Sequence, residues 1–220
     1  MRSDIKALIF DLDGTLADTI PAIAEAINMT MRELSLPTHT EDEVKSFIGK
    51  GPRHLVSESL PRDKRDADAC LVDRALAIYN YKYSQTYLHT YKLYDGIEKA
   101  LITLSKHYKI AVLSNKQDEY VKALVKQLLP QGIYQIACGS IDCIPAKPSP
   151  ELALTVIKEL GVAPHECVMI GDSDVDILTA KNAGLHILAV AWGYMSKDEL
   201  SVKGAKDILD DPRELTKYFI

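Results

Sequence analysis

Short apolar runs alternate with helical patterns along most of this chain, and this alternation is the strongest constraint on its fold. A short continuous apolar run is typical of a strand that is buried on both faces of a sheet. We predict such strands at residues 7–10, 110–113, 136–138, 168–170 and 187–191. Amphipathic helices are predicted between them, at residues 97–106, 119–129, 150–160 and 174–182. Strands that alternate with helices form a parallel, doubly wound α/β sheet with right-handed crossovers.

The segment from residue 17 to residue 92 interrupts this alternation. It contains no convincing strand pattern, and we predict helices in it at residues 21–34, 41–47, 53–60 and 62–91. The sequence therefore predicts two domains. Residues 1–16 and 93–220 form an α/β core, and residues 17–92 form an inserted all-helical domain, called the cap below.

Four polar motifs lie in the predicted core, and three of them directly follow predicted strands. In a doubly wound sheet, ligands bind beyond the carboxyl ends of the strands, so we expect the motifs to meet there. Asp11 and Asp13 share one face of an extended segment, where like charges repel, and a cation is therefore expected beside them. The motifs are Asp11-Leu12-Asp13-Gly14-Thr15, Ser114-Asn115, Lys147-Pro148 and the run from Gly171 to Asp176.

The four motifs, in this order, resemble those of the haloacid dehalogenase (HAD) superfamily of aspartate-nucleophile phosphatases. Residues 94–97, residues 113–116 and the pair Ala183-Gly184 look more specifically like phosphoglycolate phosphatases. The resemblance extends from about residue 6 to residue 193. It implies a Rossmann-like core and a helical cap that closes over the site and selects the substrate.

The resemblance also implies a covalent mechanism for phosphate transfer. Asp11 is expected to be the nucleophile that forms an aspartyl-phosphate, which divides one difficult displacement into two easier steps. Asp13 is expected to act first as the general acid and then as the general base. An acidic residue at this position favours a phosphatase or phosphomutase over a dehalogenase. Lys147 is expected to balance the charge of the nucleophile and of the phosphoryl oxygens.

Magnesium is the cofactor that these motifs favour, because Mg²⁺ prefers hard oxygen ligands and retains several waters. We expect Asp11 and Asp172 to bind it through their side chains, and the resemblance implies that Asp13 binds it through its backbone carbonyl. Asp176 is expected to act behind these ligands, either through water or by orienting Lys147.

The remaining candidate residues concern the substrate. The Ser114 hydroxyl and the backbone N–H of Asn115 are expected to hold the phosphoryl group, as oxyanion donors do. Thr15 belongs to the same phosphate-binding set, where its hydroxyl would order the loop. Lys50 or Arg53 lies in a segment that resembles the specificity loop of phosphoglycolate phosphatases. Either side chain could pair with a substrate carboxylate, and a solvated surface charge is the alternative interpretation.

Charge and hydropathy narrow the range of possible partners and locations of the protein. A net charge of −5 and a pI near 5.7 argue against a nucleic-acid partner. No apolar run reaches the roughly 20 residues of a membrane helix. The first predicted strand follows Met1 too closely to leave room for a signal peptide. We therefore expect a cytoplasmic monomer or homodimer that acts on a small phosphorylated metabolite.

Magnesium-dependent hydrolysis of a small phosphomonoester, with 2-phosphoglycolate as the preferred candidate, is the leading functional hypothesis. The alternatives within the fold are transfer like that of β-phosphoglucomutase and hydrolysis of pyrophosphate, a sugar phosphate or a nucleotide. A binding module without activity is disfavoured, because it would not need Asp11, Asp13, Lys147 and Asp172 together.

Overall fold

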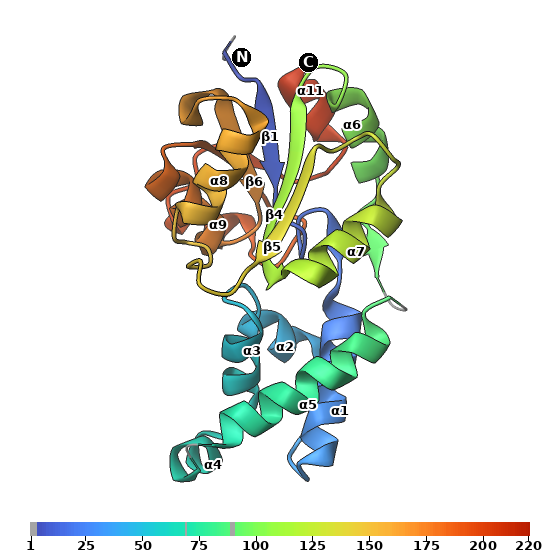
Figure 1. Ribbon diagram of the computed structural model, residues 1–220, viewed down its shortest axis with the longest axis vertical. Helices are drawn as coiled ribbons and strands as arrows, with labels where there is room; N and C mark the ends of the chain where they lie inside the picture. The colour runs from blue at the N-terminus through green and yellow to red at the C-terminus, as the bar shows by residue number, and fades with distance from the viewer. Residues whose placement is uncertain (1–3, 69, 89–90) are drawn as a thin grey trace. The chain divides into compact units, whose positions relative to one another are not determined.

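The computed structural model describes residues 4–68, 70–88 and 91–220 (Figure 1). The chain divides into two compact units, close to the division predicted from the sequence. One unit, the core, comprises Met1–Asp18 and Leu93–Ile220, and the other, the cap, comprises Thr19–Lys92.

The core is built on a six-stranded sheet in the order β5-β4-β1-β6-β7-β8. Every neighbouring pair of these strands runs parallel. The predicted α/β class and parallel, doubly wound sheet are therefore confirmed, and β8 is an additional strand too short to give a pattern. The strands are β1 (Ala7–Phe10), β4 (Lys109–Gln117), β5 (Ile136–Ser140), β6 (Cys167–Gly171), β7 (His186–Val190) and β8 (Ile208–Leu209). Two short strands, β2 (Ala17–Asp18) and β3 (Lys92–Leu93), form a separate sheet.

Helices cover both faces of the large sheet. Figure 1 shows α8 and α9 on one side of the sheet and α6, α7 and α11 on the other. Both α8 and α9 end at a glycine in the left-handed conformation, Gly161 with φ 66° and Gly184 with φ 73°. The core helices are α6 (Ile97–Leu104), α7 (Asp118–Leu128), α8 (Glu151–Leu160), α9 (Asp174–Ala183), α10 (Lys197–Val202) and α11 (Glu214–Phe219), with a 3₁₀ turn at Pro164–Glu166.

The described part of the cap is helical. Its helices are α1 (Ile20–Glu33), α2 (Glu41–Phe47), α3 (Pro52–Ser59), α4 (Arg62–Ala67) and α5 (Leu71–Thr86). The prediction of one helix over residues 62–91 was wrong, because the helix is interrupted at Asp68. That residue has an extended backbone, and its carboxylate accepts a hydrogen bond from the N–H of Cys70 at 2.9 Å. Such a local side-chain bond competes with the helix. Tyr79 and Tyr83 stack within the cap at 5.6 Å and are buried, so they serve packing.

The central strands bring the candidate catalytic segments to one edge of the sheet. Phe10, the last residue of β1, lies in register with Val112 of β4 and Ile170 of β6. The backbone N–H of Asp11 then donates to the Ile170 carbonyl at 2.9 Å. The four residues of β1 are fully buried, so this edge has a rigid base.

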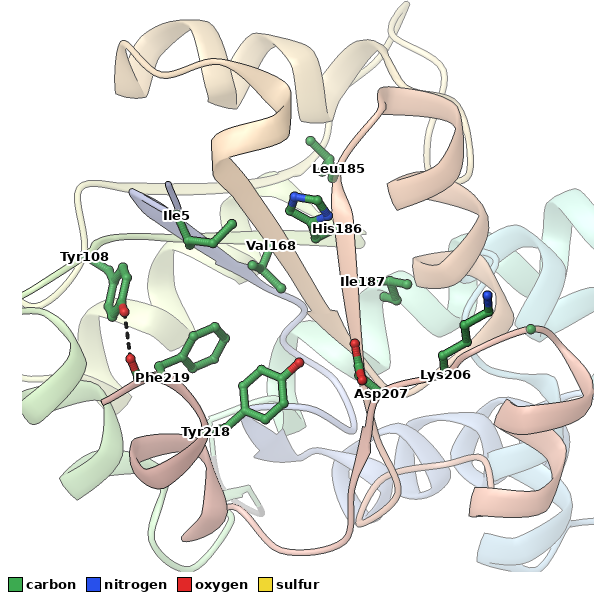
Figure 2. Close-up of a pocket in the computed structure, with 11 residues that line it drawn as sticks. Ile5, Tyr108, Val168, Leu185, His186, Ile187, Lys206, Asp207, Tyr218 and Phe219 are labelled. Atoms are coloured by element: carbon green, nitrogen blue, oxygen red, sulfur yellow. Dashed lines mark hydrogen bonds between the residues drawn. The ribbon is translucent and has the colours of Figure 1, made fainter. Parts of the chain in front are cut away.

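A separate cavity of about 620 Å³ lies near the amino ends of β6 and β7. Figure 2 shows Tyr108, Tyr218 and Phe219 on one side of it and Val168 and His186 on the sheet side. Its lining contains none of the residues of the four motifs. Within the described residues, no helix combines the length and apolarity needed to span a bilayer.

Candidate active site

Three carboxylates from two strand ends meet at the carboxyl edge of the sheet. Asp11 follows β1, Asp172 follows β6, and Asp176 lies in the first turn of α9. One oxygen atom from each lies within 4.8 Å of the others. Asp172 and Asp176 are almost completely buried. The structure therefore brings Asp11 and Asp172, the two expected side-chain ligands, together with Asp176, which was expected behind them.

Lys147 provides the cation expected beside this cluster. Its Nζ lies 3.1 Å from Asp11 Oδ1 and 2.7 Å from Asp176 Oδ1. Only 2% of the Lys147 side chain is exposed, so the charge is sustained by its partners rather than by water. Burial by itself lowers the pKa of Lys147. The nearby charges of Asp11 and Asp176 raise this pKa by more than burial lowers it, so the net result is a raised pKa. Lys147 is therefore positively charged.

Asn115 holds the backbone of Lys147. Its side-chain Nδ2 donates to the Lys147 carbonyl at 2.8 Å, and its Oδ1 accepts the Lys147 N–H at 2.8 Å. The Asn115 side chain thus positions the lysine, whereas the expectation concerned its backbone N–H. The Ser114 Oγ accepts a hydrogen bond from the N–H of Lys116 at 3.3 Å.

Asp172 is held by hydrogen bonds to both of its carboxylate oxygens. The Thr15 hydroxyl donates to Oδ1 at 2.7 Å, and the Tyr194 N–H donates to Oδ2 at 2.8 Å. Thr15 is completely buried, and the Trp192 Nε1 donates to its carbonyl at 3.0 Å. Thr15 was placed in the phosphate-binding set, but the structure places its hydroxyl on Asp172. Thr15 and Asp172 are both bonded to residues of the segment 192–194, which the sequence analysis missed.

Asp176 and its neighbours explain the start of α9. The Ser173 Oγ donates to Asp176 Oδ2 at 2.6 Å and caps the helix by accepting the Asp176 N–H. The other oxygen of Asp176, Oδ1, lies 2.7 Å from Lys147 Nζ. Of the two roles expected for Asp176, this contact corresponds to orienting Lys147. Asp174 instead forms a partly exposed ion pair with Lys203 at 3.4 Å.

Asp13 has a cationic partner that the sequence analysis did not identify. Lys116 Nζ lies 3.1 Å from Asp13 Oδ2, and the two side chains are 7% and 12% exposed. The sequence signal was a lysine directly after Ser114-Asn115, which was used only as part of a resemblance. Tyr94 was likewise not selected. Burial and the nearby charges of Asp18, Asp172 and Asp13 raise its pKa, which places its phenol in the same electrostatic environment.

The cap candidates lie on the surface of their own unit. Arg53 Nη1 is 2.6 Å from Asp73 Oδ1, and both side chains are more than 60% exposed. Lys50 is also exposed. An exposed pair of this kind contributes little to stability. The roles of Lys50 and Arg53 toward a substrate remain predictions.

The electrostatics of the site fit a divalent cation. Burial raises the pKa of Asp11 to about 7, with Asp176 and Asp13 adding to the effect against the opposing charge of Lys147. Burial also raises the pKa of Asp172. With all four carboxyl groups of residues 11, 13, 172 and 176 ionised, the two ammonium groups of Lys147 and Lys116 leave two negative charges for a bound cation to offset. The clustered donors are carboxylate oxygens, which suit Mg²⁺ better than a softer metal.

The raised pKa of Asp11 predicts how the stability of the metal-free protein depends on pH. Between about pH 4 and pH 7 the folded state binds more protons at Asp11 than the unfolded state does, so its free energy of unfolding falls as the pH rises. Asp11→Asn removes this contribution. Urea denaturation in EDTA at pH 5 and pH 7 should therefore show a smaller loss of stability in the variant than in the wild type. Equal losses would contradict the electrostatic account.

Gly193 is a second testable feature, because it packs against the catalytic loop. A Cβ at this position would lie 2.2 Å from the Gly14 carbonyl oxygen and 2.5 Å from Asp172 Cβ. Gly193→Ala should therefore lower stability by about 1–3 kcal/mol and reduce turnover together. Gly161→Ala is the control, since it meets nothing within 4 Å and only strains a helix end at φ 66°. It should lose stability without losing turnover. Normal turnover in Gly193→Ala would contradict the packing argument.

The fold and the site place this chain among α/β enzymes whose functional groups lie at the carboxyl edge of a parallel sheet. A family model described as haloacid dehalogenase-like hydrolase matches residues 8–190, and the chain belongs to that family.

Relatives and solved structures agree with this assignment. The phosphoglycolate phosphatase of Nitrosospira multiformis is 32% identical over 192 residues, covering 86% of this chain and 85% of that protein. That of Colwellia psychrerythraea is 29% identical over 214 residues, covering 96% and 95%. A crystal structure from Lactobacillus delbrueckii subsp. bulgaricus, described as a candidate phosphoglycolate phosphatase, has a TM-score of 0.92 at 30% identity and covers 99% of both chains. A haloacid dehalogenase-like hydrolase from Streptococcus pneumoniae has a TM-score of 0.87 at 26% identity, covering 99% and 100%.

Proposed function

We propose that this protein is a magnesium-dependent phosphatase that hydrolyses 2-phosphoglycolate through an aspartyl-phosphate on Asp11. The observation that carries the proposal is the contact between the Asp11 carboxylate and the buried ammonium of Lys147, at the carboxyl edge of the sheet and two residues from Asp13. The names of relatives that match nearly the whole chain support the choice of substrate.

In the first step, a carboxylate oxygen of Asp11 attacks phosphorus and the bond from phosphorus to the ester oxygen breaks. Asp13 gives its proton to the departing alkoxide, which leaves as an alcohol. Lys147 offsets the negative charge of the attacking group and of the phosphoryl oxygens. The Ser114 hydroxyl and the Asn115 N–H, at the end of β4, are the proposed donors to those oxygens.

In the second step, Asp13, now ionised, accepts a proton from water as the water oxygen attacks phosphorus. The bond from phosphorus to the Asp11 oxygen breaks, so inorganic phosphate leaves and the Asp11 carboxylate is restored. Asp13 is then protonated for the next cycle. One group thus performs both proton transfers, each of which contributes about 10²–10⁴-fold in general acid–base catalysis.

The side chains of Asp11 and Asp172 and the backbone carbonyl of Asp13 are the proposed ligands of Mg²⁺. When bound, the ion supplies positive charge for the phosphoryl oxygens. Asp176 holds Lys147, and Thr15 holds Asp172 in the orientation required of a ligand. We further propose that the cap, through Lys50 or Arg53, selects the substrate, and that the protein acts in the cytoplasm as a monomer or homodimer.

Trp192 offers a test of the metal site that does not depend on turnover. It is the only tryptophan of the chain, and its indole bonds to Thr15, whose hydroxyl bonds to Asp172. Addition of Mg²⁺ should therefore change the tryptophan fluorescence in a saturable manner. Asp172→Asn should weaken the apparent affinity by at least about tenfold. An unchanged titration curve in this variant would rule out Asp172 as a ligand.

The substrate is tested by phosphate release from a panel that contains 2-phosphoglycolate, a sugar phosphate, pyrophosphate and a nucleotide, each with Mg²⁺ or EDTA. The proposal expects the highest kcat/KM for 2-phosphoglycolate, with loss of activity in EDTA. A strong preference for another ester would overturn the assignment of 2-phosphoglycolate as the substrate and would leave the proposed mechanism unchanged. Conversion of the sugar phosphate into an isomer without phosphate release would indicate a phosphomutase instead.

A further inference from the structure

We propose that Lys116 is the positioning residue of Asp13: its buried ammonium holds the Asp13 carboxylate in place for both proton transfers. This inference rests on the proposed phosphatase function and adds a residue to its machinery. The motifs assign a cation to the nucleophile, Lys147, but none to the acid and base.

The geometry gives each carboxylate of the Asp-x-Asp pair its own lysine. Lys147 Nζ lies 3.1 Å from Asp11, and Lys116 Nζ lies 3.1 Å from Asp13. Both ammonium groups are buried, with 2% and 7% of their side chains exposed. Charges held out of water in this way contribute more to orientation than surface pairs do, because water competes less for them.

The two lysines are also linked through consecutive residues at the end of β4. Asn115 binds the backbone of Lys147, and Lys116 comes next in the chain and binds Asp13. The register of β4 against β5 shifts between Leu113 and Gln117, so an irregularity of the strand falls on these residues. Irregularities of this kind re-aim side chains next to active sites.

Asp13 needs an anchor for two reasons. It lies in the turn after β1, outside the sheet's strands, where it forms an isolated bridge with Ala17 and is followed by Gly14 at φ 82°. In addition, the carboxylates of Asp11 and Asp13 repel each other whenever both are ionised. Because a misplacement of about 1 Å can reduce a rate about 10²-fold, a fixed cation beside Asp13 has a direct kinetic value.

If Lys116 positions Asp13, the loss of activity on removing Lys116 should depend on the leaving group of the substrate. An alkyl phosphate needs the proton that Asp13 supplies, whereas p-nitrophenyl phosphate releases a stable phenolate that does not. Lys116→Met should therefore lower kcat for an alkyl ester by about 10–100-fold, with little change in KM. The rate constant for cleavage of the aryl ester, measured in a single turnover, should fall by less than about threefold. Lys116→Arg, which keeps the cation, should recover part of the loss.

A double-mutant cycle gives the sharper test. In an Asp13→Asn background there is no carboxylate for Lys116 to position, so adding Lys116→Met should cause no further loss of alkyl-ester turnover. Lys122→Met is the matched control, since this lysine pairs with Asp118 on the exposed side of α7 with 62% of its side chain exposed. It should behave as the wild type. Thermal unfolding of each variant identifies any that is not folded.

Three outcomes would overturn the proposal. Equal losses for alkyl and aryl esters would indicate a structural role, and a raised KM with normal kcat would indicate substrate binding. Additive losses with Asp13→Asn would exclude any action through Asp13. If Lys116→Met is unfolded, Lys116→Gln is used for the same comparisons. Failure of the phosphatase function itself is distinguishable, because the wild type would then release no phosphate from either ester.

Discussion

Asp11→Asn should abolish phosphate release, with a loss of at least about 10⁴-fold in kcat. The amide is nearly the same size as the carboxylate but cannot attack phosphorus, so the first step has no nucleophile. The fold should persist, because the substitution removes one of several buried like charges next to Lys147. Phosphate release and thermal unfolding, measured on the same preparation, check both parts of this prediction.

Asp174→Asn is the matched control for this variant. It makes the same chemical change in the last motif, but Asp174 pairs with Lys203 at the surface and not with the acidic centre. Its turnover should equal that of the wild type. Normal magnesium-dependent turnover in Asp11→Asn would show that another group attacks phosphorus.

Lys147→Met should cost both stability and turnover. The substitution leaves Asp11 and Asp176 buried without their shared cation, and breaking a buried ion pair in this way typically costs about 3–5 kcal/mol. Turnover should fall further than the loss of folded protein explains, because the charge opposite the nucleophile is also lost. Urea denaturation and the activity of the folded fraction separate the two effects.

A surface lysine provides the comparison for Lys147. Lys203→Met removes a cation from a pair whose side chains are 49% and 33% exposed, and the expected cost is within about 1 kcal/mol. If Lys147→Met were as stable and as active as Lys203→Met, the central place given to Lys147 would be wrong.

The fold was predictable because its signals are local. Apolar runs located β1, β4, β5, β6 and β7, and helical periodicity located α6, α7, α8 and α9 between them. The boundary between α4 and α5 was not predicted, since a single Asp68 side chain outweighed an otherwise continuous helical pattern. A two-residue strand such as β8 is defined by its pairing with β7 and is too short to show a hydrophobic pattern in the sequence.

The site was predictable only where its residues stand in motifs. Asp11, Asp172, Asp176 and Lys147 were selected from order and context, and the structure brings them together. The contacts of Thr15 and Asn115 depend on tertiary geometry, which turns one toward Asp172 and the other toward Lys147. Lys116 stands directly after the Ser114-Asn115 motif, but its contact with Asp13 exists only after the sheet has formed. The segment from Trp192 to Tyr194 likewise meets the catalytic loop only in the folded protein, and no spacing in the sequence indicates it.

The most direct measurement is the capture of phosphate on the nucleophile. The wild-type protein is mixed with 2-phosphoglycolate and Mg²⁺, quenched during turnover and treated with borohydride, which reduces an acyl phosphate to the alcohol and converts the modified aspartate to homoserine. We expect homoserine at position 11 in the digested protein, and none when substrate is omitted. Homoserine at another aspartate, or steady hydrolysis with no reducible intermediate, would contradict the proposed mechanism.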